Sequence, residues 1–210
     1  MPNTEIYLIR HGLPEYEYDS EGFKLAYGPE ANLSEEGRKQ AHAIAHKLPK
    51  LDVMHSSPFA RARQTSEIIA SHIGFNAEDI VESKIFADQQ PINFEGKLLN
   101  DVIAGNIELD PDDETDEQVY ERVNRGFEDI LKNHAGKKVG IVFHGHPIRY
   151  IVWKHVEKKE PFKSIPEDFI HANYALQGEA WVLILNEEHD LIDSHLITRD
   201  DNQNPGRGVW

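Results

Sequence analysis

Two histidines with the potential for chemistry each follow a short apolar run. The run Ile6–Ile9 leads through Arg10 to His11, and His144 comes directly after Val139–Phe143. Strands that are apolar on both faces lie inside a sheet covered by helices, and such sheets bind ligands at the carboxyl ends of their strands. If the two strands are neighbours, we expect His11 and His144 to converge on one small site.

Permanent positive charges accompany these histidines. Arg10 precedes His11, and Arg61 lies in the first turn of an expected helix that follows a serine-proline turn. Guanidinium groups match the oxygens of a tetrahedral phosphoryl group, and the backbone amides around Gly12 and Gly145 would add hydrogen-bond donors. These residue types around one point predict a phosphate pocket.

The imidazole side chain supplies a nucleophile for such a pocket. It is largely neutral and nucleophilic near pH 7 without a separate activating base. One of the two histidines can therefore attack phosphorus directly while the other donates a hydrogen bond. The expected intermediate is a covalent phosphohistidine, and the chemistry alone leaves open which histidine carries it.

Strands and helices alternate along the rest of the chain. Apolar spacing and capping residues predict a helix from Ser34 to Leu48, a short strand over 51–57, helices over 60–73, 115–134 and 148–156, and a hairpin of strands over 181–185 and 191–197. This order predicts an α/β fold, a three-layer α/β/α sandwich with a mainly parallel central sheet.

Two long segments show no periodicity. Residues 13–32 contain four aromatic side chains and several chain breakers, and loops of this length in a compact domain are usually lids or binding segments. The aromatic side chains of residues 13–32 either face a substrate or fill the core, and the sequence leaves both interpretations open. Residues 83–116 are also expected to be irregular.

The composition limits the kind of protein. A chain of 210 residues with 39% hydrophobic residues suits one domain, which we assign to residues 1–199, with 200–210 as an unanchored tail. The net charge of −15 argues against nucleic-acid and anionic-membrane partners. The chain has no cysteine, no signal-peptide pattern and no apolar run of about 20 residues. We expect a cytoplasmic protein whose oligomeric state is open.

Four segments, taken in order, resemble the histidine phosphatase superfamily, which includes the cofactor-dependent phosphoglycerate mutases. They are Leu8–Gly12, Leu33–Gly37, Ser56–Thr65 and His144–Arg149, within a resemblance that runs from Ile6 to about Ala180. It implies a phosphoglycerate mutase-like fold without a cofactor. It also implies that His11 is the nucleophile, and that Arg10, Arg61 and His144 bind the phosphoryl group.

The resemblance further implies a carboxylic acid that protonates the leaving alkoxide. The family segment Leu-x-Glu-x-x-x-Gly-x-Trp-Glu-Gly fits residues 86–96 with the same spacing, so that Asp88 takes the place of the acid. Here aspartate replaces the more frequent glutamate and Ile92 replaces a glycine, which leaves Glu95 as the reserve acid. Asn173 resembles a family asparagine near the site.

Some of these residues allow other interpretations. His144 and His146 would suit a metal pair, but no further ligand lies at helical spacing, so we expect no metal and interpret His146 as shaping the pocket or capping a turn. Arg149 either stabilises its helix or contacts substrate. The acidic run over 110–117 lacks the ligand pattern of a calcium loop and is expected to be solvated.

The predicted activity is metal-independent hydrolysis of the phosphomonoester of a small phosphorylated metabolite. Phosphoglycerate mutase activity is the nearest alternative, but the segments after the nucleophile and around the acid do not resemble those of the family's mutases. A catalytically silent protein that binds a phosphorylated ligand is an alternative of another class. The identity of the substrate depends on residues 13–32 and 88–115, which no general rule interprets.

Overall fold

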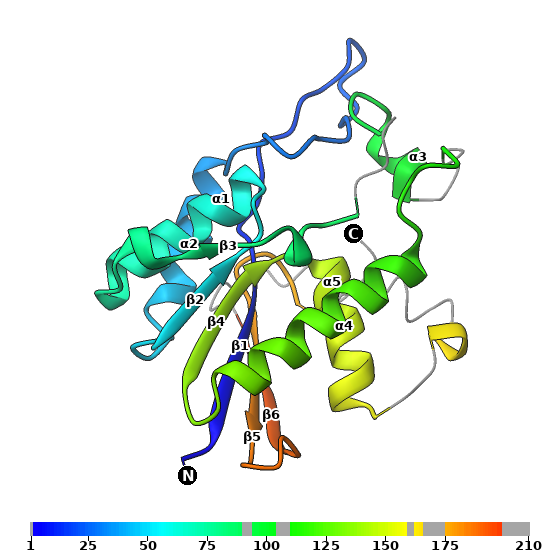
Figure 1. Ribbon diagram of the computed structural model, residues 1–210. Coiled ribbons are helices and arrows are strands. Elements are labelled where there is room, and N and C mark those ends of the chain that lie inside the picture. The colour runs from blue at the N-terminus through cyan, green and yellow to red at the C-terminus, as the bar shows by residue number, and fades with distance from the viewer. Residues whose placement is uncertain (1, 90–93, 104–109, 159–161, 166–174, 199–210) are drawn as a thin grey trace.

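A mixed sheet forms the centre of the molecule (Figure 1). The computed structural model describes residues 2–89, 94–103, 110–158, 162–165 and 175–198. Within them six strands are arranged in the order β3-β2-β4-β1-β5-β6. The strands are β1 (Thr4–Arg10), β2 (Val53–Ser56), β3 (Val81–Glu82), β4 (Lys138–Phe143), β5 (Ala180–Leu185) and β6 (Leu191–Ile197).

The first four strands in chain order are parallel, and the last two form the predicted hairpin. β3, β2, β4 and β1 pair in parallel, while β5 pairs antiparallel with both β1 and β6. β1 and β4 are direct neighbours, and Arg10 at the end of β1 is in register with Phe143 at the end of β4. The condition for convergence of His11 and His144 is therefore met, and the two residues leave the sheet side by side.

Helices cover both faces of the sheet (Figure 1). One face packs against α1 (Glu35–Ala45) and α2 (Ala60–Ile73), and the other packs against α4 (Asp116–Asn133) and α5 (Gly145–Ile151). Residues of β1 and β4 contribute to both buried clusters, because neither face of a central strand meets solvent. The predicted three-layer α/β/α sandwich is confirmed.

The ends of these helices follow from their capping residues. Ser34 caps α1 by accepting from the Gly37 amide, and Thr115 forms a capping box with Gln118 at the start of α4. α2 ends at Gly74, whose φ of 71° is the left-handed conformation that glycine adopts without strain. α1 stops at Ala45, three residues before the predicted end.

Further predicted boundaries differ from the structure. α5 begins at Gly145 rather than Ile148, because Pro147 in the first turn lacks only an amide that would have no acceptor in the helix, and it continues as a π-helix over Val152–Val156. The segment 83–116 is not wholly irregular, since it contains α3 (Leu99–Ile103) and the 3-10 turn Lys84–Phe86. Other 3-10 turns are Ala77–Asp79 and Phe162–Ser164.

The segment 13–32 extends beyond the carboxyl ends of the parallel strands, close to α3 (Figure 1). It has no helix or regular strand, and isolated bridges such as Leu25 with Leu98 hold it in place. Tyr18 is 57% exposed and Phe23 is 52% exposed. For these two aromatic residues the core-filling interpretation is wrong.

Two further predictions concern the chain as a whole. Among the described residues, no helix is both long enough and apolar enough to cross a membrane. The predicted tail over 200–210 lies outside the described residues.

Candidate active site

His11 lies at the end of β1 with its ring enclosed by protein. Its side chain is 2% exposed, and its backbone amide donates to the Phe143 carbonyl, which ties it to β4. Nδ1 lies 2.7 Å from the carbonyl oxygen of Gly12. Because a carbonyl oxygen only accepts, Nδ1 carries the proton, and Nε2 of the neutral ring has a free electron pair.

Arg61 contacts that electron pair from the first turn of α2. Its Nε donates to His11 Nε2 across 3.2 Å, and its Nη1 donates to the Gly28 carbonyl, also across 3.2 Å. The guanidinium lies over the ring of Tyr27, with its Cζ 4.8 Å from the ring centroid. Burial, followed by the positive charges of Arg61 and Arg10, holds the pKa of His11 well below its ordinary value.

His144 lies beside His11, with 5.0 Å between the ring centroids. It is completely buried, and its Nε2 lies 2.8 Å from the hydroxyl oxygen of Ser57. Its Nδ1 has no hydrogen-bond partner among the described residues. Burial, followed by the charge of Arg61, holds the pKa of His144 well below its ordinary value, so this ring is also neutral.

Arg10 and Gly145 meet at the start of α5. A Cβ atom on Gly145 would lie 2.9 Å from Cζ of Arg10, so glycine is what allows the guanidinium to approach the first turn of this helix. Nη1 of Arg10 donates to the Ala175 carbonyl. Burial lowers the pKa of Arg10, a group with a very high ordinary value, so the guanidinium stays charged.

One expected donor is engaged elsewhere. The amide of Gly12 donates to the hydroxyl oxygen of Thr65 across 3.1 Å, and that hydroxyl donates to the Arg61 carbonyl. The Gly12 amide is thus part of the link between β1 and α2, and the prediction that it would add a donor for phosphate was wrong.

Asp88 brings a carboxyl group to His144 and Arg61. Its Oδ2 lies 3.6 Å from Nδ1 of His144 and 3.8 Å from Nη2 of Arg61, and the side chain is 25% exposed. The reserve acid, Glu95, is an exposed residue whose carboxylate packs against Gly28. The structure therefore brings Asp88 to the site, whereas no ion pair joins Glu95 to the arginines or histidines of the site within the described residues. Asn173 and Ile92 are outside the described residues.

His146 and Arg149 belong to the same helix, α5, and both lie near Asp88. His146 is in contact with Tyr150 and Asp116, so it does more than cap a turn. Arg149 is buried, and its Nε has no hydrogen-bond partner in the described part of the chain. Burial lowers the pKa of Arg149, and the negative charges of Asp116 and Asp88 oppose this lowering. The described residues contain no group of three or more ligands that would hold a metal ion.

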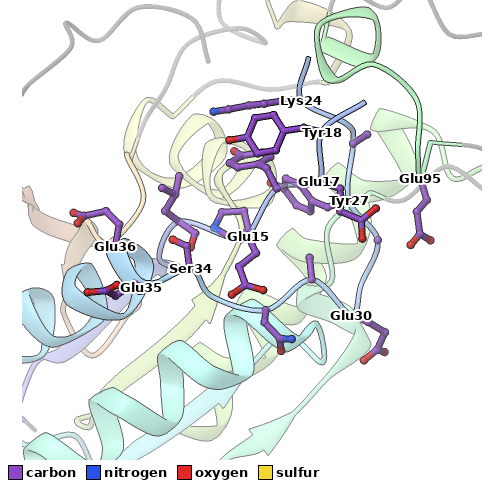
Figure 2. Close-up of a pocket in the computed structure, with 17 residues that line it drawn as sticks. Glu15, Glu17, Tyr18, Lys24, Tyr27, Glu30, Ser34, Glu35, Glu36 and Glu95 are labelled. Atoms are coloured by element: carbon purple, nitrogen blue, oxygen red, sulfur yellow. The ribbon is translucent and has the colours of Figure 1, made fainter. Parts of the chain in front are cut away.

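A cavity of about 730 Å³ is lined mainly by residues of the 13–32 segment (Figure 2). Its lining includes Tyr16, Tyr18, Tyr27, Lys24 and six glutamates, namely Glu15, Glu17, Glu30, Glu35, Glu36 and Glu95. None of the histidines or arginines of the site lines it, although Gly28 and Tyr27 contact both the cavity and Arg61. Its acidic lining is unsuited to a phosphoryl group.

Two residues with a part in this geometry were missed by reasoning from the sequence. Ser57 fixes one nitrogen of His144, and Thr65 ties the strand of His11 to the helix of Arg61. Both lie within the segment Ser56–Thr65, where Arg61 alone was given a role. Their position beside the arginine in that segment is the signal that would have pointed to them.

Comparison with known proteins shows which family the chain belongs to. Residues 6–173 match the sequence model of the histidine phosphatase superfamily, branch 1. The chain belongs to this superfamily. The predicted family and the predicted phosphoglycerate mutase-like α/β fold are thus confirmed.

The similar proteins include phosphatases and a probable phosphoglycerate mutase. Phosphoserine phosphatase 1 of Hydrogenobacter thermophilus is 30% identical over 165 residues, which cover 70% of this chain and 73% of the relative. A probable phosphoglycerate mutase of Citrobacter koseri is 27% identical over 155 residues, covering 67% and 69%. The structure of a mycobacterial glucosyl-3-phosphoglycerate phosphatase superposes with a TM-score of 0.71 at 16% identity, covering 95% and 100%. The chain is a phosphatase-type enzyme of the histidine phosphatase superfamily.

Proposed function

We propose that this histidine phosphatase hydrolyses small phosphomonoesters without a metal, through a phosphohistidine on His11. The observation that carries the proposal is the electron pair on His11 Nε2, which the Nδ1 contact to Gly12 leaves available. Arg10, Arg61 and His144 surround it with two positive charges and a neutral donor. This arrangement suits a dianion bound beside a nucleophile.

In the first step, the guanidinium of Arg61 donates to the phosphoryl oxygens instead of to Nε2 of His11, which leaves Nε2 available for attack. The bond from Nε2 to phosphorus forms as the bond from phosphorus to the leaving oxygen breaks, and Asp88 gives its proton to that oxygen. Nδ1 of His144 donates to an equatorial oxygen, and the two arginines offset the developing charge.

In the second step, Asp88 takes a proton from water. The water oxygen bonds to phosphorus as the bond to Nε2 breaks, which releases inorganic phosphate and restores both side chains. The position of Asp88, with Oδ2 within 4 Å of both His144 and Arg61, supports its role as the acid and base. Residues 1–199 form the catalytic domain in this proposal.

The relatives suggest which esters to test first. Their names refer to phosphoserine, phosphoglycerate and glucosyl-3-phosphoglycerate, which are phosphomonoesters of small hydroxy acids. We extend this substrate class to the present chain, with hydrolysis preferred to mutase chemistry because the segments after the nucleophile and around the acid do not resemble those of mutases.

The deciding experiment is turnover of nitrophenyl phosphate in EDTA by the wild type and by His11→Ala. We expect the wild type to remain active in the chelator and His11→Ala to lose about 1,000-fold or more in kcat. Loss of activity in EDTA, or an active His11→Ala variant, would reject the proposal. Release of phosphate from 3-phosphoglycerate then supports a hydrolase, whereas interconversion of its isomers supports a mutase.

A further inference from the structure

His146 lies between two carboxylates, and the proposed cycle uses only one of them. Its Nδ1 is 3.9 Å from Oδ1 of Asp88, and its Nε2 is 3.3 Å from Oδ1 of Asp116 and 2.8 Å from the hydroxyl of Tyr150. Three elements meet here, because Asp116 begins α4, His146 and Tyr150 belong to α5, and Asp88 follows a 3-10 turn.

The hydrogen bonds of the cluster determine which nitrogen of His146 carries a proton. Burial favours the neutral form of Asp116, yet the hydrogen bond and charge of His146 hold the pKa of Asp116 below its ordinary value. Burial, followed by the charge of Asp116, raises the pKa of Tyr150, so the phenol keeps its proton. Because the Asp116 carboxylate only accepts, Nε2 of His146 carries a proton. Nδ1 faces Oδ1 of Asp88, and it donates to that oxygen in the imidazolium form of the ring, in which both nitrogens carry protons.

The two oxygens of Asp88 meet different surroundings. Oδ2 faces the phosphoryl site, beside Arg61 and His144. Oδ1 is buried without a hydrogen-bond partner among the described residues, and His146 faces it. Arg149 from α5 is the further charged group, close enough to interact electrostatically with both Asp88 and Asp116. Oδ2 of Asp88 is therefore the oxygen available for proton transfer, and Oδ1 is the oxygen that a neighbouring side chain can hold.

We propose that His146, anchored by Asp116 and Tyr150, is a positioning residue that holds Oδ1 of Asp88 and so keeps Oδ2 directed at the leaving oxygen. This inference rests on the proposed role of Asp88 as the acid. The separation of 3.9 Å exceeds a hydrogen bond, and contacts of this kind shorten when substrate completes the site. Without His146 the carboxyl group rotates, and protonation of the leaving oxygen becomes slower.

Two substitutions of His146 separate its two nitrogens. The side chain of His146→Asn places its terminal group near the position of Nδ1, facing Asp88, whereas that of His146→Gln reaches the position of Nε2, facing Asp116. On an alkyl phosphate such as phosphoserine, we expect kcat to fall about tenfold or more in His146→Gln and about threefold in His146→Asn. On nitrophenyl phosphate, whose leaving group needs little protonation, we expect changes of threefold or less in both.

The experiment also includes a substitution of Asp116, which holds His146, and two control variants. Asp116→Asn replaces the carboxylate that faces Nε2 by a neutral amide, and we expect it to reduce kcat on the alkyl ester selectively. This variant provides the test if His146→Gln does not fold. His195→Gln, at a half-exposed histidine on β6, should leave both esters unchanged. Asp88→Asn tests the underlying role, because equal losses on both esters in that variant would reject Asp88 as the acid.

With Asp88 confirmed, three outcomes would overturn the role of His146. The first is a His146→Gln variant that keeps wild-type turnover of the alkyl ester. The second is an equal loss on both esters, because a purely structural role affects the two esters alike. The third is a rise in KM without a fall in kcat.

Discussion

Arg61 donates its Nε hydrogen to Nε2 of His11 across 3.2 Å. Arg61, which is proposed to bind the phosphoryl group, thus contacts the nitrogen of His11 that is proposed to attack phosphorus. A guanidinium cannot give up its proton, so this contact requires the ring of His11 to be neutral at Nε2. An incoming dianion competes for the same guanidinium, which couples phosphate binding to release of the nucleophile.

This coupling predicts that Arg61→Lys will be strongly impaired. Lysine keeps the positive charge but cannot contact His11, Gly28 and a phosphoryl oxygen with separate nitrogens. We expect kcat/KM for nitrophenyl phosphate to fall about 100-fold. Arg63→Lys, at a half-buried arginine of the same helix, is the matched control and should stay within threefold of wild type. An Arg61→Lys variant as active as this control would show that charge alone suffices.

The protonation of His11 can be observed directly by long-range ¹H–¹⁵N NMR. Burial and the two arginines hold its pKa well below 6.5, and the Gly12 carbonyl holds the proton on Nδ1. At pH 6 we expect a neutral ring with Nδ1 protonated and Nε2 unprotonated, whereas an ordinary histidine is mostly charged there. A titration midpoint at or above 6.5, or protonation of Nε2 in the neutral ring, would contradict this geometry.

Ser57 offers a test of His144 as a hydrogen-bond donor. If the hydroxyl of Ser57 donates to Nε2 of His144, Nδ1 keeps the proton that a phosphoryl oxygen requires. We expect Ser57→Ala to reduce kcat about tenfold, because the ring loses its preferred tautomer and orientation. Ser56→Ala is the matched control, because the neighbouring hydroxyl of Ser56 is equally buried and donates to the Ser57 carbonyl. Equal activity in the two variants would exclude the proposed part of Ser57.

His55 on β2 predicts a pH dependence of stability separate from the site. Burial, followed by the charge of His134, lowers the pKa of His55 to about 4, and its Nε2 has no hydrogen-bond partner among the described residues. Because the unfolded chain takes up this proton near pH 6.5, the free energy of unfolding falls by about 3 kcal/mol between pH 6.5 and 4 through this residue. Urea unfolding of His55→Leu should show a weaker decline than the wild type over that range, and parallel declines would contradict the assignment.

Much of the fold follows from local pattern. The apolar runs that end at Ile9 and Phe143 predicted two buried strands, which the structure shows to be parallel neighbours, and Ser34 and Thr115 predicted the starts of α1 and α4. Boundaries that depend on tertiary contact were less accessible. α3, for example, is only five residues long, so its apolar spacing is too brief to indicate a helix.

The site was predictable in its residue types and less so in its contacts. Arg10, His11, Arg61, His144 and Asp88 come together as expected. The sequence could not show that Thr65 occupies the Gly12 amide or that His146 lies between two carboxylates, because those partners are far apart along the chain and meet only when α2, α4 and α5 pack. Hydrogen-bond networks of this kind depend on packing rather than on local spacing.

The central claim is that the phosphoryl group is transferred to His11. Its most direct test is to mix the enzyme with a labelled substrate, quench within the first turnover at alkaline pH, and map the label by peptide mass spectrometry. We predict one phosphoryl group on the peptide that contains His11, bound to the imidazole and absent from His11→Ala. Label on another residue, or a rapid release of phosphate with no labelled enzyme at any time, would contradict the account.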